Sequence, residues 1–415
     1  MVESRVVSIA IFGLLQENVS LVTIELVTYL CAFVLMLHVH SSGKRNATML
    51  VAAALQIILV DLVLFSGRRW HAQAWLMLLP ERLPLYNVLL QAQLYYMAFV
   101  ATSRLRIDNV LQPIAMGLLV AGVMLPFELL GGKFIWWTYH DTDPLLVDRF
   151  YTIPFHTLFT HLCFGMSFLT SHHMLCKSDE KTSRNRYWLL GDYYEEEHWK
   201  REWGYAVALP LFSLGFGIFF FIIFNHVFVQ ALGIPISTWF VIILGLCLLI
   251  FWMADREKDE AHIQEALAPV DAYDSDWLYP CIDHAVNQMM FIYTFILGVL
   301  VCLVDPSEIV SVGHHQALGN CVEEESFRSL IGIRFDRKKY LCVHEFDEEF
   351  NLCNYPLAQM NYEESWYMIC GRGFSDKAAY AALVISSIVI LNLLFFQILK
   401  RPKKTRTVSF TKKYI

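Results

Sequence analysis

Several side chains that could perform acid–base chemistry interrupt a sequence that is otherwise strongly apolar. The stretch WWTYHDTDPLL, residues 136–146, places two tryptophans, a tyrosine, a histidine and two aspartates between two apolar segments. A carboxyl group buried among apolar side chains stays protonated near neutral pH and can donate a proton, while aromatic rings can stabilise the resulting carbocation. We therefore expect acid–base chemistry, and the candidate catalytic residues are Glu25, Asp61, Glu128, His140, Asp141 and His156.

Aromatic and amide side chains near these residues are candidates for binding the substrate. They are Trp136, Trp137, Tyr139, Gln91 and Tyr95. The three aromatic residues of the motif also fit an interfacial belt, because amphipathic rings prefer the headgroup level of a bilayer. Asp143, which precedes Pro144, equally fits a helix cap. The sequence leaves both interpretations open.

The histidine spacing does not favour a metal site. His156 and His161 are five residues apart, so on a regular helix they point about 140° apart and do not share a face. The serines and cysteines lie in no recognisable nucleophile motif. The sequence therefore identifies no cofactor, and it leaves open whether the protein is an enzyme.

The composition places the chain in a lipid bilayer. Hydrophobic residues make up 56% of the 415 residues and the mean hydropathy is +0.44, which is more apolar surface than a soluble core can bury. Runs of about 20 apolar residues, long enough to cross the hydrocarbon layer, recur along the chain. The formal net charge of -7 argues against nucleic acid as a partner, because phosphate binding needs a basic surface. Membrane lipids are the expected surroundings.

The chain is predicted to be an all-α, polytopic transmembrane bundle. The nine predicted spans cover residues 19–40, 47–66, 83–103, 109–127, 152–175, 204–227, 235–254, 282–304 and 379–399. Residues 1–304 thus form the main bundle, residues 305–378 a loop before the last span, and residues 400–415 a basic tail. The loop is too small for a large core, so we expect disulfides to fix its shape.

Three features of the sequence agree on the orientation. The tail KRPKKTRTVSFTKKYI is dense in lysine and arginine, as expected for a cytosolic flank. The loop contains four cysteines that suit two disulfides in an oxidising lumen, with their pairing left open: Cys321, Cys342, Cys353 and Cys370. Nine spans then leave the N-terminus lumenal, where Asn18 of the sequon Asn18-Val19-Ser20 is a candidate for glycosylation. Arg68 and Arg69 fall on the lumenal side and oppose this orientation.

In this orientation, polar residues inside the spans converge on the lumenal leaflet. Glu25 lies about two turns from the lumenal end of the first span, and Asp61 lies a little more than one turn from that of the second. Glu128 follows the fourth span and His156 begins the fifth. Since ionisable side chains in a membrane are costly, this convergence predicts a functional pocket built from spans one to five.

The C-terminus carries a candidate cellular address. Lys412 and Lys413 occupy the fourth and third positions from the end, as in the dilysine retrieval signal of endoplasmic reticulum membrane proteins. The first residues lack the small-residue cleavage pattern of a signal peptide. We therefore expect a protein of the endoplasmic reticulum membrane that the coat-protein retrieval machinery recognises.

One segment resembles known membrane families. Residues 128–161, which contain GGKFIWWTYHDTDPLLVDRFYTIPFHTLFTH, resemble a WWTxHDTDP signature of uncharacterised eukaryotic polytopic membrane proteins. The segment is also distantly similar to membrane carotenoid hydratases and cyclases, in which an acidic residue and a glycine before an aromatic stretch precede a proline-bearing helix. That similarity implies acid-initiated chemistry on a polyene, with Glu128 and Asp141 at the matching acidic positions.

The leading hypothesis is a protein that binds or modifies a hydrophobic small molecule, a lipid or an isoprenoid, in a pocket of the lumenal leaflet. A transporter is the first alternative. It would need polar residues that continue to the cytosolic side, where the sequence offers few beyond His38, His172 and His173. A non-catalytic adaptor that acts through its lumenal loop is the second alternative.

Overall fold

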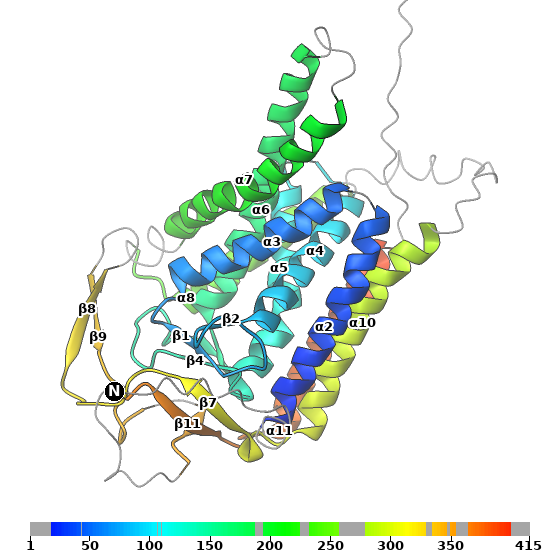
Figure 1. Ribbon diagram of the computed structural model, residues 1–415. Helices are drawn as coiled ribbons and strands as arrows, with labels where there is room; N and C mark the ends of the chain where they lie inside the picture. The colour runs from blue at the N-terminus through cyan, green and yellow to red at the C-terminus, as the bar shows by residue number, and fades with distance from the viewer. Residues whose placement is uncertain are drawn as a thin grey trace, which may run out of the picture.

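A bundle of α-helices with small β-sheets at one end forms the structure (Figure 1). This computed structural model describes residues 18–42, 44–105, 107–108, 110–186, 194–224, 232–256, 279–328, 334–346, 349–353 and 364–399. We call the end of the bundle that carries the sheets the sheet end. The helices among the described residues are α2 (Val19–Ser42), α3 (Lys44–Leu64), α4 (Leu85–Arg104), α5 (Gln112–Lys133), α6 (Phe155–Arg186), α7 (Tyr194–Phe221), α8 (Ile236–Arg256), α10 (Tyr279–Leu303) and α11 (Lys377–Leu399).

Six of the described helices contain stretches that are long and apolar enough to cross a membrane. These stretches are Val19–His40, Asn46–Leu64, Gln112–Lys133, Trp203–Phe224, Val286–Leu303 and Lys377–Leu399. In α8 the apolar stretch is shorter, Ile236–Ile250. α4 and α6 fall outside this set because they contain many polar side chains, such as Gln91, Gln93 and His161. Each predicted span coincides with a helix, while a total of nine membrane crossings stays a prediction.

The central helix of the bundle is α5, which packs against α4, α6, α8, α10 and α11. Its crossing with α6 depends on glycine. A Cβ atom on Gly117 would lie 2.6 Å from the carbonyl oxygen of Leu162, and one on Gly165 would lie 2.9 Å from the Cα of Gly117. Small residues at a crossing let two membrane helices approach closely and gain van der Waals contact. The crossing therefore fixes the relative positions of α5 and α6, which carry Glu128 and His161.

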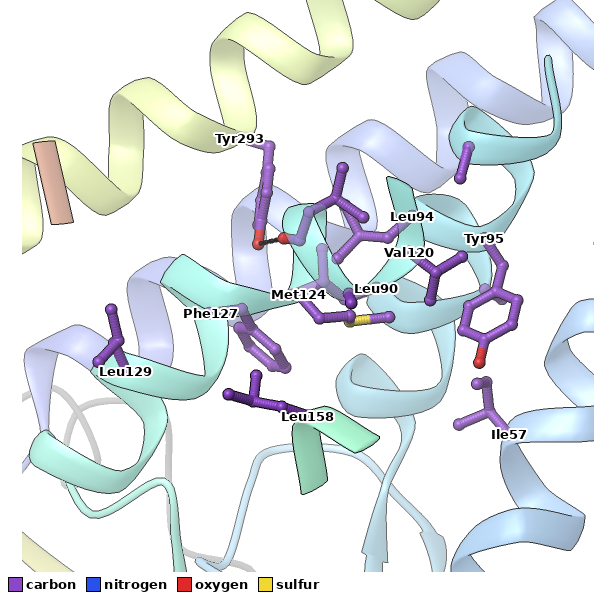
Figure 2. Packing of buried hydrophobic residues seen from close by; sticks show 14 of the residues in the cluster. Ile57, Leu90, Leu94, Tyr95, Val120, Met124, Phe127, Leu129, Leu158 and Tyr293 are labelled. Carbon is purple, nitrogen blue, oxygen red and sulfur yellow. Dashed lines mark hydrogen bonds between the residues drawn. The ribbon is translucent and has the colours of Figure 1, made fainter. Parts of the chain in front are cut away.

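Aromatic and aliphatic side chains fill the core on both sides of α5 (Figure 2). Tyr293 of α10 donates a hydrogen bond to the carbonyl oxygen of Val123 at 3.1 Å, and Leu158 of α6 lies beside Phe127 on the other side of α5. The polar tip of Tyr293 is thus satisfied by the helix backbone while its ring is buried.

The prediction of an all-α fold is incomplete, because short β-strands form between the helices and after α10. The strands are β1 (Arg69–His71), β2 (Met77–Leu79), β3 (Leu83–Pro84), β4 (Trp137–Tyr139), β5 (Arg149–Phe150), β6 (Ile153–Pro154), β7 (Val310–His314), β8 (Glu324–Arg328), β9 (Arg334–Lys338), β10 (Phe350–Asn351) and β11 (Trp366–Gly371). β11 lies between β10 and β7 in an antiparallel sheet, and β8 pairs with β9. Strands this short leave no long hydrophobic pattern in the sequence.

Two disulfides stabilise the described residues between 305 and 376, which we call the sheet domain. They join Cys321 to Cys342 and Cys353 to Cys370, which confirms the prediction that these four cysteines are paired. Cys370 lies in β11 and Cys353 follows β10, so the second disulfide joins neighbouring strands of the sheet.

The sheet domain is joined to the bundle by backbone hydrogen bonds. Strand β1, which follows α3, pairs with β4, which follows α5. Beyond β1, the amide of Gln73 donates to the carbonyl oxygen of Val312 at 2.8 Å, and Ala72 pairs with Gly313. The segment after α3 therefore connects the helices to β7 of the sheet domain.

Replacing Cys353 and Cys370 together with serine should destabilise the sheet domain more than the helices. This disulfide joins residues separated by 17 positions, and a crosslink of that size contributes about 3 kcal/mol in the chain-entropy model. We expect limited proteolysis in detergent to cut the double variant within residues 305–376 several-fold faster than the wild type. The matched control is Cys302→Ser, which removes an exposed free thiol of α10. Equal cleavage of the double variant and the control would contradict the expectation.

A buried ionic cluster as the candidate functional site

An ion-paired arginine occupies the interior of the sheet end. Nη2 of Arg69 lies 2.9 Å from Oδ1 of Asp61, and Nη1 of Arg69 lies 3.9 Å from Oε1 of Glu128. The side chains of Arg69, Asp61 and Glu128 are only 4%, 6% and 0% exposed. A charge removed from water is tolerated when it is paired, so β1, α3 and α5, which supply these residues, must meet here.

Glu128 has two further partners. Nε2 of His161 lies 2.8 Å from Oε1 of Glu128, and the hydroxyl of Tyr139 donates to Oε2 at 3.1 Å. The indole of Trp137 donates in turn to the hydroxyl of Tyr139 at 3.1 Å. Arg69 and Tyr139 lie opposite each other in the β1–β4 register, which brings both over the same carboxylate. We call Asp61, Arg69, Glu128, Tyr139 and His161 the ionic cluster.

The turn after α3 directs Arg69 into the protein. The amides of Arg68 and Arg69 both donate to the carbonyl oxygen of Phe65 at 3.1 Å. The Arg69 guanidinium then lies over the ring of Phe65, 4.3 Å from its centroid, and 5.9 Å from the centroid of Trp137. A desolvated cation–π contact contributes about 2 kcal/mol, so the aromatic rings add to the ion pairs in holding the guanidinium.

Charges and burial set the protonation of the residues in β1 and β4. Burial opposes the charge of Arg69, but Asp61 and Glu128 raise the pKa of the guanidinium above its usual value. Burial lowers the pKa of His71, although its Nε2 lies 3.8 Å from Oδ1 of Asp61. Burial and the carboxylate of Glu128 raise the pKa of the Tyr139 hydroxyl. At neutral pH, β1 therefore carries a cationic guanidinium and a neutral imidazole, and Tyr139 keeps its proton.

A second set of charges joins the bundle to the sheet domain. Nη1 of Arg337 in β9 lies 3.0 Å from Oδ2 of Asp143, and Nε of Arg68 lies 3.3 Å from the same oxygen. Nη2 of Arg337 lies 2.6 Å from Oε1 of Glu325. Both guanidinium groups lie over the ring of Phe327, at 4.3 and 4.8 Å from its centroid. We call these five residues the clamp.

The predicted catalytic residues His140 and Asp141 contact the clamp and the sheet domain. The amide of Asp141 donates to Oε1 of Gln316 at 2.9 Å. The amide of His140 donates to the carbonyl oxygen of Arg68 at 2.8 Å. Burial, with the charges of Arg337 and Arg68, lowers the pKa of His140 to about 3, so its imidazole is neutral at physiological pH. These two residues therefore connect the motif to the sheet domain.

The predicted catalytic residue Glu25 anchors the chain that follows β1. Its carboxylate accepts hydrogen bonds from the amides of Trp75 and Leu76, both at 3.1 Å, and from the hydroxyl of Tyr29 at 2.7 Å. A carboxylate that satisfies two backbone amides in a buried position supports the local fold. Glu25 is therefore engaged at a place separate from the ionic cluster.

Asn18 and Trp136 fix the start of α2. Oδ1 of Asn18 accepts a hydrogen bond from the amide of Leu21 at 3.0 Å, which is the bond of a helix N-cap. The side-chain amide of Asn18, only 2% exposed, donates to the carbonyl oxygen of Phe134 at 3.5 Å. The indole of Trp136 donates to the hydroxyl of Ser20 at 3.0 Å. The sequon is therefore part of the packed structure.

The remaining predicted site residues lie in the helical core. Gln91 donates a hydrogen bond within α4 at 3.0 Å. The ring of Tyr95 packs edge-on against Phe168, and that of His156 against Phe221, with centroids 5.9 and 4.8 Å apart. Of the six candidate catalytic residues, the structure thus brings only Asp61 and Glu128 into one cluster.

Sequence reasoning missed the arginines that hold the candidate site together. In the sequence, Arg68 and Arg69 are only charges that oppose the predicted orientation, and no pattern singles out Arg337. The run Arg68-Arg69-Trp70-His71 directly after an apolar span was the available signal. Two arginines that contradict the positive-inside rule indicate ion pairs inside the protein.

A partly open apolar cavity lies between α5, α8 and α11, and we call it the lateral groove. Its volume is about 240 Å³, and its lining includes Leu118, Leu125, Leu158, Phe240, Leu244 and Leu394. All of its lining residues are apolar, and none of the predicted catalytic or substrate-binding residues is among them. Leu125 and Leu158 precede Glu128 and His161 by three residues each, so the groove ends about one helical turn from the ionic cluster.

The fold and the buried charges together define a class of protein, a helical bundle with helices long and apolar enough to cross a membrane, covered at one end by a disulfide-bonded sheet domain. Within this class, the chain belongs to the family described as Domain of unknown function (DUF7802), whose model matches residues 10–400. No curated protein and no solved structure matches the chain significantly. The similarity to carotenoid hydratases and cyclases stays a prediction.

Arg69→Met should destabilise the protein strongly, because it leaves two carboxylates buried without their cation. Removing one partner of a buried ion pair costs about 3–5 kcal/mol. We expect a lower midpoint of thermal unfolding, followed by tryptophan fluorescence in detergent, and a partial recovery when Asp61→Asn is added. The control is Arg372→Met, which removes an exposed guanidinium. Simple addition of the two single effects would show that Arg69 and Asp61 do not depend on each other.

Proposed function

We propose that the protein binds the hydrocarbon chain of a lipid or isoprenoid molecule in the lateral groove. The observation that carries this proposal is the lining of the groove, which is apolar throughout and comes mainly from α5, α8 and α11. An apolar pocket in a protein interior is the usual site for an apolar ligand. Among the described residues, this groove supports the predicted class of ligand better than the ionic cluster does.

The shape and position of the groove favour a chain-like ligand. Its lining on α5 runs from Ala115 to Leu125, which is about 15 Å at 1.5 Å per residue. α5 and α11 are among the helices apolar enough to cross a membrane, so hydrocarbon surrounds the opening. A chain can therefore enter sideways from the bilayer without crossing a polar layer.

The arrangement of the ionic cluster does not favour acid–base catalysis, so we propose that the protein binds the ligand and does not modify it. Both carboxylate oxygens of Glu128 have partners, since His161 contacts Oε1 and Tyr139 donates to Oε2. A proton donor must face its substrate within hydrogen-bonding distance, and Glu128 lies outside the lining of the groove. We therefore assign the cluster a role in joining β1, β4 and the helices.

The proposed location is the endoplasmic reticulum membrane, with the sheet domain in the lumen. Two disulfides in this domain support an oxidising compartment. Arg68 and Arg69 do not oppose this orientation, because both are ion-paired inside the protein. The tail is then cytosolic, where Lys412 and Lys413, which lie outside the described residues, would be accessible to coat proteins.

Leu118→Trp should reduce lipid binding, because the larger side chain fills the middle of the groove. We expect the amount of lipid that copurifies in detergent, measured by mass spectrometry per mole of protein, to fall several-fold for the bound species. The matched control is Ile390→Trp, at a position of α11 that is 65% exposed and outside the groove.

A third variant tests whether the lipid binds in the lateral groove or at the motif of residues 136–146. His140→Ala with Asp141→Asn should leave the bound lipid unchanged, because neither residue lines the groove. Loss of the lipid in this variant but not in Leu118→Trp would refute the proposed site. It would indicate that the lipid binds at residues 136–146 instead.

Lys412→Ser with Lys413→Ser should release the protein from the endoplasmic reticulum. A retrieval signal is read by a receptor, so its loss changes location without changing the fold. We expect fluorescence microscopy to show the double variant in later secretory compartments. The control is Lys403→Ser with Lys404→Ser, which removes two lysines of the same tail outside the signal. Reticular residence of both variants would leave the protein without a functional dilysine signal.

A further inference from the structure

A second open cavity lies between α10 and α11, and we call it the edge groove. Its volume is about 450 Å³, and all of its described lining residues belong to these two helices. α10 lies at one edge of the bundle, beside α2 and α11 (Figure 1). Both α10 and α11 contain stretches that are apolar enough to cross a membrane, so the edge groove faces lipid.

Three carboxamide side chains line the edge groove together with apolar ones. Asn287 and Gln288 come from α10, and Asn392 comes from α11. A mostly apolar pocket with a few convergent polar groups has the usual composition of a small-molecule site. The edge groove therefore differs in chemistry from the lateral groove, whose lining is entirely apolar. The apolar residues of the edge groove are Phe291, Ile292, Leu393 and Phe396.

Hydrogen bonds fix the orientation of the Asn392 amide. Its nitrogen donates to the hydroxyl of Thr294 at 2.8 Å and to the carbonyl oxygen of Ile388 at 2.9 Å. A carbonyl oxygen only accepts, so the atom that faces Ile388 must be the nitrogen, and both of its hydrogens are engaged. The amide oxygen has no partner among the described residues. Asn392 therefore supplies a fixed hydrogen-bond acceptor to the edge groove.

The amides of Asn287 and Gln288 have no hydrogen-bond partner in the described part of the chain. They are the second and third residues of the apolar stretch Val286–Leu303, at its end away from the sheet domain. This position is near the headgroup level of a bilayer. Each carboxamide can both donate and accept a hydrogen bond. The outer part of the edge groove thus offers free donors and acceptors.

The polar groups lie at two depths. Thr294, which contacts Asn392, follows Gln288 by six residues, about 9 Å along α10. The ring of Phe291 and the side chain of Ile292 lie between these two levels of α10. A ligand in the edge groove therefore meets amides near the membrane surface, then apolar side chains, and one acceptor deeper in the bilayer.

The lining favours an uncharged head group. None of the described lining residues carries a charge. A phosphate or carboxylate would lose water in this groove without gaining a counter-charge, which is costly. Hydroxyl and carbonyl groups, in contrast, match the donors and acceptors of the three carboxamides.

The size of the lining side chains favours a lipid over a second membrane helix. Membrane helices approach each other closely at Gly, Ala, Ser or Thr, and none of the described lining residues is of these types. Phe291, Leu393 and Phe396 are instead large and are 60%, 57% and 54% exposed. These side chains keep another helix backbone at a distance, and they offer apolar walls to a hydrocarbon chain.

We propose that the edge groove binds an uncharged lipid whose head carries hydroxyl and carbonyl groups, of the diacylglycerol or ceramide type. The Asn392 oxygen accepts a hydrogen bond from a hydroxyl, and the amides of Asn287 and Gln288 bond the other polar groups of the head. The hydrocarbon chains pack against Phe291 and Leu393.

This site is independent of the proposed binding in the lateral groove. Leu394 lines the lateral groove and Asn392 lines the edge groove. The two residues are two positions apart, which is about 200° around a helix. The two grooves therefore lie on opposite sides of α11.

The chain offers a matched set of variants. Asn287→Leu with Gln288→Leu removes two amides that have no described partner, and leucine keeps a similar size, so the fold should persist. The control is Gln397→Leu, which removes an exposed amide of α11 outside the edge groove. Gln397 directly follows Phe396, so it lies at the same depth as the edge groove.

The experiment is native mass spectrometry of the full-length protein in detergent, with dioleoylglycerol, a ceramide or dioleoyl phosphatidic acid added separately. Dioleoylglycerol and dioleoyl phosphatidic acid have the same chains and differ only in the head. We expect the wild type and Gln397→Leu to bind at least one uncharged lipid more tightly than phosphatidic acid. In Asn287→Leu with Gln288→Leu this binding should weaken roughly tenfold, which is about 1.4 kcal/mol, close to two hydrogen bonds in a membrane.

Three results would overturn the proposal. These are equal binding of the uncharged lipids to the wild type and the double variant, tighter binding of phosphatidic acid, and no binding of either uncharged lipid. A protein dimer that only the double variant loses, without bound lipid, would assign the edge groove to a second copy of the chain.

Leu118→Trp separates this proposal from the lateral groove. When it is added to the wild type and to the double variant, hydrocarbon chains are excluded from the lateral groove, and the roughly tenfold difference between the two proteins should remain. Loss of that difference would show that the lipid was bound in the lateral groove. The effect of Leu118→Trp alone on copurified lipid tests the lateral groove, so either proposal can fail without the other.

Discussion

A guanidinium that is removed from water needs carboxylates within a few ångströms, and this requirement joins parts of the chain that are distant in sequence. Arg69 satisfies it with Asp61 from α3 and Glu128 from α5. The same ion pairs depend on the turn after α3 and on the β1–β4 pairing, which position Arg69 and Tyr139. The hydroxyl of Tyr139 donates a hydrogen bond to Glu128. The clamp meets the same requirement for the preceding residue, because Arg68 and Arg337 of the sheet domain both pair with Asp143. The sheet end is therefore organised by two consecutive buried arginines.

The helices and the disulfides of this chain were predictable, because both leave strong local signals. An apolar run of twenty residues has few alternatives to a helix in a membrane, and four cysteines in one loop favour pairing with each other. The site was only partly predictable. Polarity within a span correctly singled out Asp61 and Glu128. The cation that pairs with them comes from the segment between two helices, and no periodic pattern predicts which residue of such a segment points inward.

The same limit explains the roles of His140 and Asp141. Their sequence neighbours suggested a catalytic group, whereas their backbone amides bond Arg68 and Gln316, partners that only the fold identifies. Short strands such as β4 could not be predicted either, because three residues are too few to show the two-residue alternation of a strand. The aromatic residues Trp136 and Trp137 are fully buried and belong to the core, so composition alone did not distinguish an interfacial belt from packing.

The buried cap of α2 has a consequence for the maturation of the chain. The side-chain nitrogen of Asn18, to which a sugar would be attached, donates a hydrogen bond to the carbonyl oxygen of Phe134. The hydroxyl of Ser20 in the same sequon accepts a hydrogen bond from the indole of Trp136. A bulky glycan cannot coexist with these contacts, because the Asn18 side chain has almost no accessible surface. Oligosaccharide at Asn18 would therefore mark molecules in which α2 has not docked, and a glycosidase-induced shift in electrophoretic mobility would count the unassembled fraction.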